Sequence, residues 1–153
     1  MSSQPPPPVM QAPCVPPAEQ IRFRAHSRTR WSDEDNQGVL NNAVFLTLLE
    51  EARHQYCEHL GLIGVQNQFT FVLGQTNLRH LAPGHGPADV EIQIATVRLG
   101  QRSFHQVYRI CPSSGHEVWA EAEAVMVIWD SKNGGSAAMP AFFRDRIAEF
   151  EGL

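Results

Sequence analysis

The residues best suited to chemistry form the stretch SDEDNQGVLNN, residues 32–42. It contains three adjacent carboxylates, Asp33, Glu34 and Asp35, followed by a glycine and the start of a helical pattern. A carboxylate can act as a general base or as a nucleophile. The free N–H groups in the first turn of a helix can stabilise a developing negative charge. The alternative is that the acids are solvated turn residues and that Asn41 or Asn42 only caps the helix.

The elements on either side would hold this stretch in place. Residues 21–31 alternate in their first part and predict a strand. Residues 41–60 predict a helix, because apolar side chains recur at spacings of three and four. They are Phe45, Leu48, Leu49, Ala52, Tyr56 and Leu60. Gly61 is placed to end the helix in a left-handed conformation. The acidic stretch is therefore expected to connect a strand to a helix N-terminus.

Four more strands are predicted after the helix, over residues 69–81, 89–99, 103–111 and 117–129, with a short terminal helix at 140–151. Ala120, Ala122 and Ala124 share one face of the last strand, which leaves room for the long helix to lie close. The order indicates an α+β fold in which one helix is wrapped by a curved antiparallel sheet. Such a sheet has edge strands, and pairing two subunits would cover one.

Composition limits the possible functions. The chain has 153 residues, of which 42% are hydrophobic, and its formal net charge is −4. No basic cluster indicates a nucleic-acid partner or an anionic membrane surface. There is no apolar run of membrane-spanning length and no signal-peptide pattern. The three scattered cysteines, Cys14, Cys57 and Cys111, suit a reducing cytoplasm.

Residues 1–20 differ from the rest because prolines dominate them. Proline has no amide donor, so this composition predicts a disordered or polyproline-like tail, with an SH3-type ligand as the alternative. Residues 21–153 are expected to form one domain, since roughly 130 residues suffice for a single core.

Three motifs together resemble a known family. They are Asp33-x-Asp35-x-x-Gly38, then residues 41–46 (NNAVFL), then residues 50–53 (EEAR). In this order the sequence resembles the acyl-CoA thioesterases of the 4-hydroxybenzoyl-CoA thioesterase type, which have the hotdog fold. The resemblance covers about residues 21–150. It implies hydrolysis of an acyl-CoA or related pantetheine thioester, and a homodimer or homotetramer with active sites between subunits.

The resemblance also implies roles for individual residues. The catalytic carboxylate matches Asp35, as base or nucleophile, and the backbone N–H that polarises the thioester carbonyl matches Asn42. Gly38 allows close backbone approach to the substrate. The coenzyme A nucleotide would lie at the turn 100–102, where Arg102, with Ser103 beside it, is the candidate phosphate contact. No metal or redox cofactor is implied. Because Arg102 is the only basic residue of that turn, a carrier-protein thioester remains an alternative substrate.

Other interpretations of the sequence stay open. Glu50 or Glu51 on the helix could supply the carboxylate, although surface pairing with Arg53 or Arg30 is the simpler role. His54 and Cys57 share a helix face, but His59 points away from it, which argues against zinc. A hotdog hydratase or dehydratase would need an Asp/His pair that this loop lacks. A non-catalytic protein that binds acyl-CoA or an acyl carrier is the second alternative.

Overall fold

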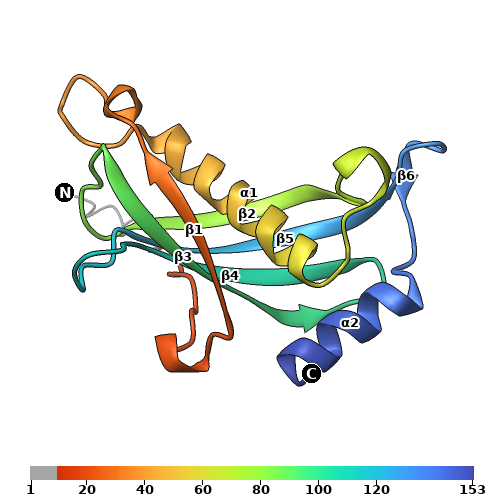
Figure 1. The fold of residues 1–153 in the computed structure, drawn as a ribbon. Helices are drawn as coiled ribbons and strands as arrows, with labels where there is room; N and C mark the ends of the chain where they lie inside the picture. Colours follow the sequence, from red (N-terminus) through yellow and green to blue (C-terminus); the bar gives the residue numbers. More distant parts are fainter. Residues whose placement is uncertain (1–9) are drawn as a thin grey trace, which may run out of the picture.

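A computed structural model describes residues 10–153 as one sheet with two helices (Figure 1). The elements, in chain order, are β1 (Phe23–Thr29), α1 (Asn42–His59), β2 (Phe71–His80), β3 (Ala88–Leu99), β4 (Ser103–Pro112), β5 (Ala120–Asp130), β6 (Gly135–Ser136) and α2 (Ala141–Glu151). Short 3-10 turns lie at Ala18–Gln20, Trp31–Asp33 and Val65–Asn67. None of the helices in this part of the chain has the length and apolar character that a membrane crossing needs.

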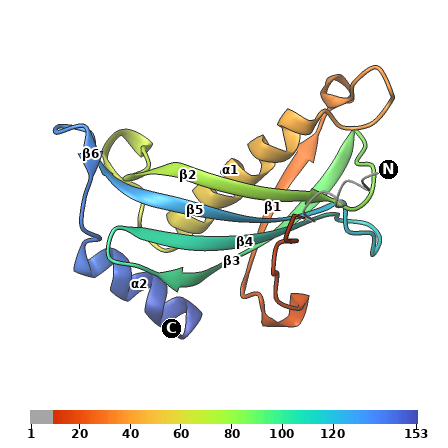
Figure 2. The same ribbon diagram turned by 180° about the vertical axis from the view of Figure 1, so that it is seen from behind.

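The strands form one antiparallel sheet in the order β1-β3-β4-β5-β2, with the two-residue β6 paired to β5. β1 and β2 are therefore the two edges of the sheet. α1 crosses one face, which we call the inner face, and the N-terminal segment lies on the other, the outer face (Figures 1 and 2). This arrangement confirms the predicted α+β hotdog architecture of a long helix against a curled antiparallel sheet.

The core lies between α1 and the inner face. The helix contributes the apolar stripe that the sequence predicts, and every second residue of β3, β4 and β5 faces it, as the strand period requires. The largest fully buried core side chains include Tyr56, Phe104, Tyr108, Ile92 and Ile94. Burying one such side chain contributes about 1.5–3 kcal/mol. Ala120, Ala122 and Ala124 are buried here as expected, although the closest backbone approach of α1 is to β1 and β3.

The ends of α1 follow from local chemistry. Asn41 is the N-cap, and its Oδ1 accepts a hydrogen bond from the Ala43 N–H at 2.9 Å. At the other end Gly61 has φ of +69°, the left-handed conformation that ends a helix at low cost for glycine. The helix start is thus fixed next to the acidic stretch.

Residues 10–20, which belong to the predicted tail, lie against the outer face in the structure. Pro13 is buried, and backbone carbonyls of this segment accept hydrogen bonds from side chains of the sheet. Residues 1–9 lie outside the described residues, so the prediction of disorder for them stays a prediction. The boundary between tail and domain at residue 21 likewise stays a prediction.

Candidate active site

The acidic stretch folds into a narrow loop in front of α1. Its two arms pair through three contacts: Asn41 N–H donates to the Asp33 carbonyl at 2.9 Å, Glu34 bridges to Leu40, and Asp35 N–H donates to the Val39 carbonyl at 2.8 Å. Because the arms are antiparallel, Asp33 lies opposite the helix cap and Asp35 lies two residues farther along. The loop therefore leads from Asp35 directly back to the first residue of the helix.

Asp35 is half-buried near the tip of the loop. Its Oδ1 accepts the Gln37 N–H at 2.7 Å, and its carbonyl accepts the Gly38 N–H at 3.1 Å. Oδ2 accepts no hydrogen bond within the described chain, so it remains available to a substrate or a water. Gly38 has φ of +72°, and this left-handed conformation favours glycine at the turn that sets the position of Asp35.

The neighbouring acids have structural partners. Both carboxylate oxygens of Asp33 accept hydrogen bonds from Arg30, one from its backbone N–H at 2.7 Å and the other from its guanidinium at 2.9 Å. These bonds hold the pKa of Asp33 below its usual value. Asp33 therefore shapes the loop.

Glu34 is not a solvated turn residue. It is half-buried, and its Oε1 accepts the Gly86 N–H at 3.1 Å. Only glycine fits at this position, because a Cβ would come within 2.1 Å of the Arg30 carbonyl oxygen. Glu34 thus fastens the loop to the segment between β2 and β3, a contact that local sequence does not indicate.

Asn42, the first residue of α1, lines two cavities. One, of about 270 Å³, is open to solvent and lined mainly by apolar residues, among them Leu40, Phe45 and Leu81. The other, of about 950 Å³, lies between the first turns of α1 and the edge strand β2, and also includes Leu46 and Thr76. As the first helical residue, Asn42 has an N–H without an intrahelical acceptor. The smaller cavity also includes Val39, whose carbonyl accepts the Asp35 N–H, so the backbone of Asp35 is bonded to a residue of the cavity lining.

Two histidines stand near this cavity. His80, at the end of β2, lines it and contacts the Phe45 ring edge-on, with the ring centroids 4.8 Å apart. The Nδ1 atom of His85 lies 3.1 Å from the Gly38 carbonyl. Local sequence does not indicate that either histidine approaches the helix start, because this depends on the path of the chain after β2.

The turn between β3 and β4 is the second predicted site. Gly100 N–H donates to the Ser103 carbonyl at 2.7 Å, which closes the turn. The exposed Arg102 guanidinium donates to the Ser136 carbonyl at 2.7 Å. Arg144 of α2 reaches the same turn and donates to the Gly100 carbonyl. The structure therefore brings two arginines together where the sequence indicated one.

The β3–β4 turn and the acidic loop lie at opposite ends of the folded molecule (Figure 1). The Arg102 carbonyl accepts the Ile128 N–H, and Ile128 pairs with Phe71 at the start of β2. His80, beside Asn42, is the last residue of the same strand. Ten residues of extended chain separate these ends by about 30 Å. Arg102 and Asn42 of one chain therefore do not meet.

Comparison with known proteins identifies the family. The sequence profile described as the thioesterase-like superfamily matches residues 29–147, which is most of the chain. The chain belongs to the thioesterase-like superfamily. This confirms the expected thioesterase of the hotdog fold. No curated protein matches the chain significantly.

Several solved structures are similar to this chain along nearly their whole length. A Thermus thermophilus thioesterase complexed with coenzyme A and Zn is 29% identical, with a TM-score of 0.72 over 85% of this chain and 94% of that one. The PA2801 protein of Pseudomonas aeruginosa is also 29% identical, with a TM-score of 0.71 over 82% and 97%. PA5185 of the same organism, 23% identical with a TM-score of 0.78 over 87% and 94%, supports the fold.

The remaining candidate side chains of this thioesterase, which lie on α1, are exposed or bonded to other parts of the fold. Glu51 accepts a hydrogen bond from the Ser27 hydroxyl rather than from an arginine, while Glu50 is exposed. Arg53 is buried and donates to the Tyr108 hydroxyl at 3.1 Å. Burial raises the pKa of Cys57 to about 12, so its thiol is protonated at neutral pH. Within residues 10–153, no group of three or more His, Cys, Asp or Glu side chains could hold a metal ion.

Proposed function

We propose that the protein hydrolyses an acyl-CoA or a closely related pantetheine thioester to the free acid and the thiol. The observation that carries this proposal is the position of Asn42. Its N–H, free of any intrahelical acceptor, stands at the N-terminus of an 18-residue helix and beside an apolar cavity. A thioester carbonyl placed there would gain both a hydrogen bond and the positive end of the helix dipole.

Asp35 supplies the second half of the chemistry. As a general base, Asp35 would take a proton from a water molecule while the oxygen of that water attacks the thioester carbonyl carbon. As a nucleophile it would form a mixed anhydride, which water then opens. In both routes the C–S bond breaks, the thiol leaves with a proton, and the Asn42 N–H stabilises the oxyanion formed on the way. The apolar cavity of about 270 Å³ would hold the acyl group.

A second subunit would complete the site. The edge strand β2 carries exposed apolar side chains, with Leu73 49% exposed, and Leu46 of α1 is 46% exposed on the neighbouring helix. Pairing β2 with β2 of a second copy in antiparallel fashion would cover them. It would also bring the Phe71 end of one strand, with Arg102 nearby, next to the His80 end of the other. The proposed assembly is therefore a homodimer, or a tetramer built from it.

The β3–β4 turn would bind the nucleotide of coenzyme A. Arg102 and Arg144 provide two guanidinium groups at this turn, and Ser103 adds a hydroxyl. Guanidinium groups bind phosphate oxygens through directed, charge-assisted hydrogen bonds. The presence of Arg144 favours coenzyme A over a carrier-protein thioester.

The cellular location follows from the cysteines. Cys14, Cys57 and Cys111 are all free thiols. Free thiols in an odd number are typical of a reducing compartment, so we propose a cytoplasmic protein.

The test is a panel of acyl-CoA substrates, from short aliphatic to long aliphatic and aromatic, with released thiol measured by a thiol-reactive dye. We expect turnover, highest for acyl groups that fit the small cavity. Binding of acyl-CoA without release of thiol would support a non-catalytic acyl-binding protein instead. Addition of water to an enoyl-CoA without thiol release would indicate a hydratase.

A further inference from the structure

The N-terminal segment crosses the whole outer face of the sheet. We call residues 10–21 the strap. Its Gln11 carbonyl accepts Asn77 Nδ2 of β2 at 3.0 Å, and its Pro16 carbonyl accepts Arg109 Nη2 of β4 at 2.9 Å. The four strand spacings from β2 to β1 amount to about 19 Å. The seven residue steps from Gln11 to Ala18 would reach about 23 Å if fully extended, which is enough to span that width. The strap therefore crosses the strands of the sheet and ends in the 3-10 turn Ala18–Gln20 (Figure 2).

The hydrogen bonds suit a proline-rich segment. Pro13, Pro16 and Pro17 lack N–H groups, so the strap cannot form a regular ladder, but its carbonyls remain strong acceptors. The outer face offers side-chain donors instead. Arg24 of β1 donates to the Ala18 carbonyl at 3.4 Å, beside the Arg109 contact to Pro16.

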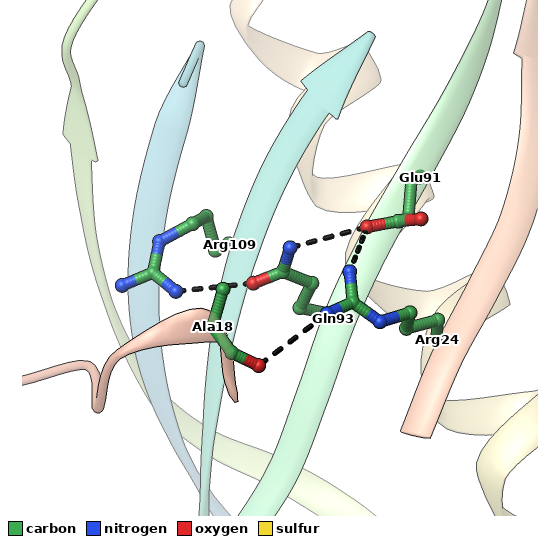
Figure 3. A network of polar contacts seen from close by, with 5 residues as sticks. All are labelled: Ala18, Arg24, Glu91, Gln93 and Arg109. Carbon is green, nitrogen blue, oxygen red and sulfur yellow. Dashed lines mark hydrogen bonds and ion pairs between the residues drawn. The ribbon is translucent and has the colours of Figure 1, made fainter. Parts of the chain in front are cut away.

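These donors are held in place by a network on the sheet. Arg109 bonds to Glu121 at 2.9 Å and to Gln93 at 3.0 Å. Gln93 donates in turn to Glu91, which pairs with Arg24 (Figure 3). The network orients both guanidinium groups toward the strap. It also pairs each arginine with a carboxylate, so this part of the outer face carries little net charge.

Beneath the strap the outer face has an apolar centre. Ala95 and Val107 form a cluster separate from the main core, closed by Ile21 and Val15 of the strap. A cavity of about 540 Å³ remains between strap and sheet and includes Val97 and Val125 in its lining. Val97 is 40% exposed even with the strap in place. Removing the strap would expose an apolar patch around Val97, Val107 and Val125, bordered by polar side chains such as Asn77 and Glu123.

We propose that the outer face is a docking surface for the strap of the same chain, and that the seated strap keeps this face from pairing with a second copy. Two such faces could pack against each other as sheets do, because their apolar centres match and their paired charges do not repel. The main core contains no residue of the range 10–20. Release of the strap should therefore change the assembly without unfolding the domain.

The test uses the full chain with two strap substitutions, Pro13→Asp and Val15→Asp, which place charges where the strap meets the sheet. The matched control, Gln11→Asp with Gln20→Asp, adds the same charge at exposed strap positions. Light scattering should show the mass of the first variant rising about twofold with concentration, while the control keeps the mass of the unaltered chain. The melting temperature of both should stay within a few degrees of that chain.

A second pair of variants locates the new contact. Adding Val97→Glu and Val125→Glu to the released-strap variant should return its mass to that of the unaltered chain, whereas adding Val65→Glu, on a distant exposed turn, should not. The proposal is overturned if the released-strap variant keeps its original mass, or if outer-face charges fail to reverse the association. Cooperative unfolding of that variant at a much lower temperature would also overturn it, because the strap would then be part of the core.

Discussion

Neighbouring carboxylates in the acidic loop do different work because they have different partners. Both carboxylate oxygens of Asp33 accept hydrogen bonds from Arg30, and Glu34 accepts one from the Gly86 N–H. Asp35 keeps one oxygen that accepts no hydrogen bond from residues 10–153. The sequence could predict a loop of acids before a helix but not this division. It depends on a backbone approach of Gly86 from more than fifty residues away. The family resemblance, rather than local chemistry, singled out Asp35.

Asp33→Asn should lower the stability of the protein at neutral pH. The folded-state pKa of Asp33 lies below the unfolded value, so its stabilisation is present above the unfolded pKa and lost as pH falls through the folded one. The difference in melting temperature between variant and unaltered chain should therefore shrink below about pH 4. A difference that stays constant down to pH 2 would show that the Arg30 contact does not depend on the charge of Asp33.

Arg102→Ala should raise the KM for acyl-CoA much more than it lowers kcat. Its guanidinium lies on the proposed nucleotide turn, far from the reacting carbon, so it contributes binding shared by ground and transition states. The effect should shrink for a short pantetheine thioester that lacks the nucleotide. Equal changes in KM for both substrates would move the nucleotide site away from this turn.

At the scale of the element, α1 does two tasks. Its apolar stripe builds the core, and its N-terminus supplies the proposed oxyanion donor. The capping by Asn41 consumes the Ala43 and Val44 N–H groups, at 2.9 Å each, and leaves the Asn42 N–H. A substitution that removes only this N–H tests the second task alone.

Asn42→Pro is that substitution, because proline is well accommodated at the first helical position and Asn41 already has φ of −58° and ψ of 139°. The fold should be kept, while kcat falls by about a hundredfold to a thousandfold. Asn42→Ala is the control, since it removes the side chain but retains the N–H, and it should lose much less. Similar kcat values for the two variants would contradict the oxyanion role.

Element boundaries were the most predictable part of the fold. The periodicity of apolar residues predicted five strands and two helices within a few residues of their observed ends, because each has one face in the core. β6 was missed, since two residues give no period. The tail was expected to be disordered or polyproline-like, and the contacts of its residues 10–20 with the outer face could not be predicted, because proline density reports a lack of ladder donors and says nothing of the side-chain donors on a sheet face. Arg144 reached the β3–β4 turn through the path of α2, which local pattern does not encode.

At the scale of the whole molecule, the proposed site needs two chains. One chain would give Asp35 and Asn42, and its partner would give Arg102. The two halves of the site lie at the two ends of β2, which is too long for them to meet within one chain. A dimer related by a two-fold axis then contains two complete sites.

Mixing two impaired variants tests this sharing. Asp35→Asn and Arg102→Ala chains, unfolded and refolded together in equal amounts, should form mixed dimers in which one site has both native residues. About a quarter of all sites should then show the native KM and kcat. If each site belonged to a single chain, the mixture would show only the sum of the two impaired enzymes.

The most direct test of the account is the kcat of Asp35→Asn on the best substrate of the acyl-CoA panel. Asn is nearly isosteric with Asp, so the bond to Gln37 and the loop should persist while the charge is lost. A lost general base costs about a hundredfold to ten-thousandfold in rate, and the loss should appear in kcat, with KM nearly unchanged. Near-full turnover by Asp35→Asn, together with loss of activity in Glu50→Gln or Glu51→Gln, would contradict the account and place the catalytic carboxylate on α1.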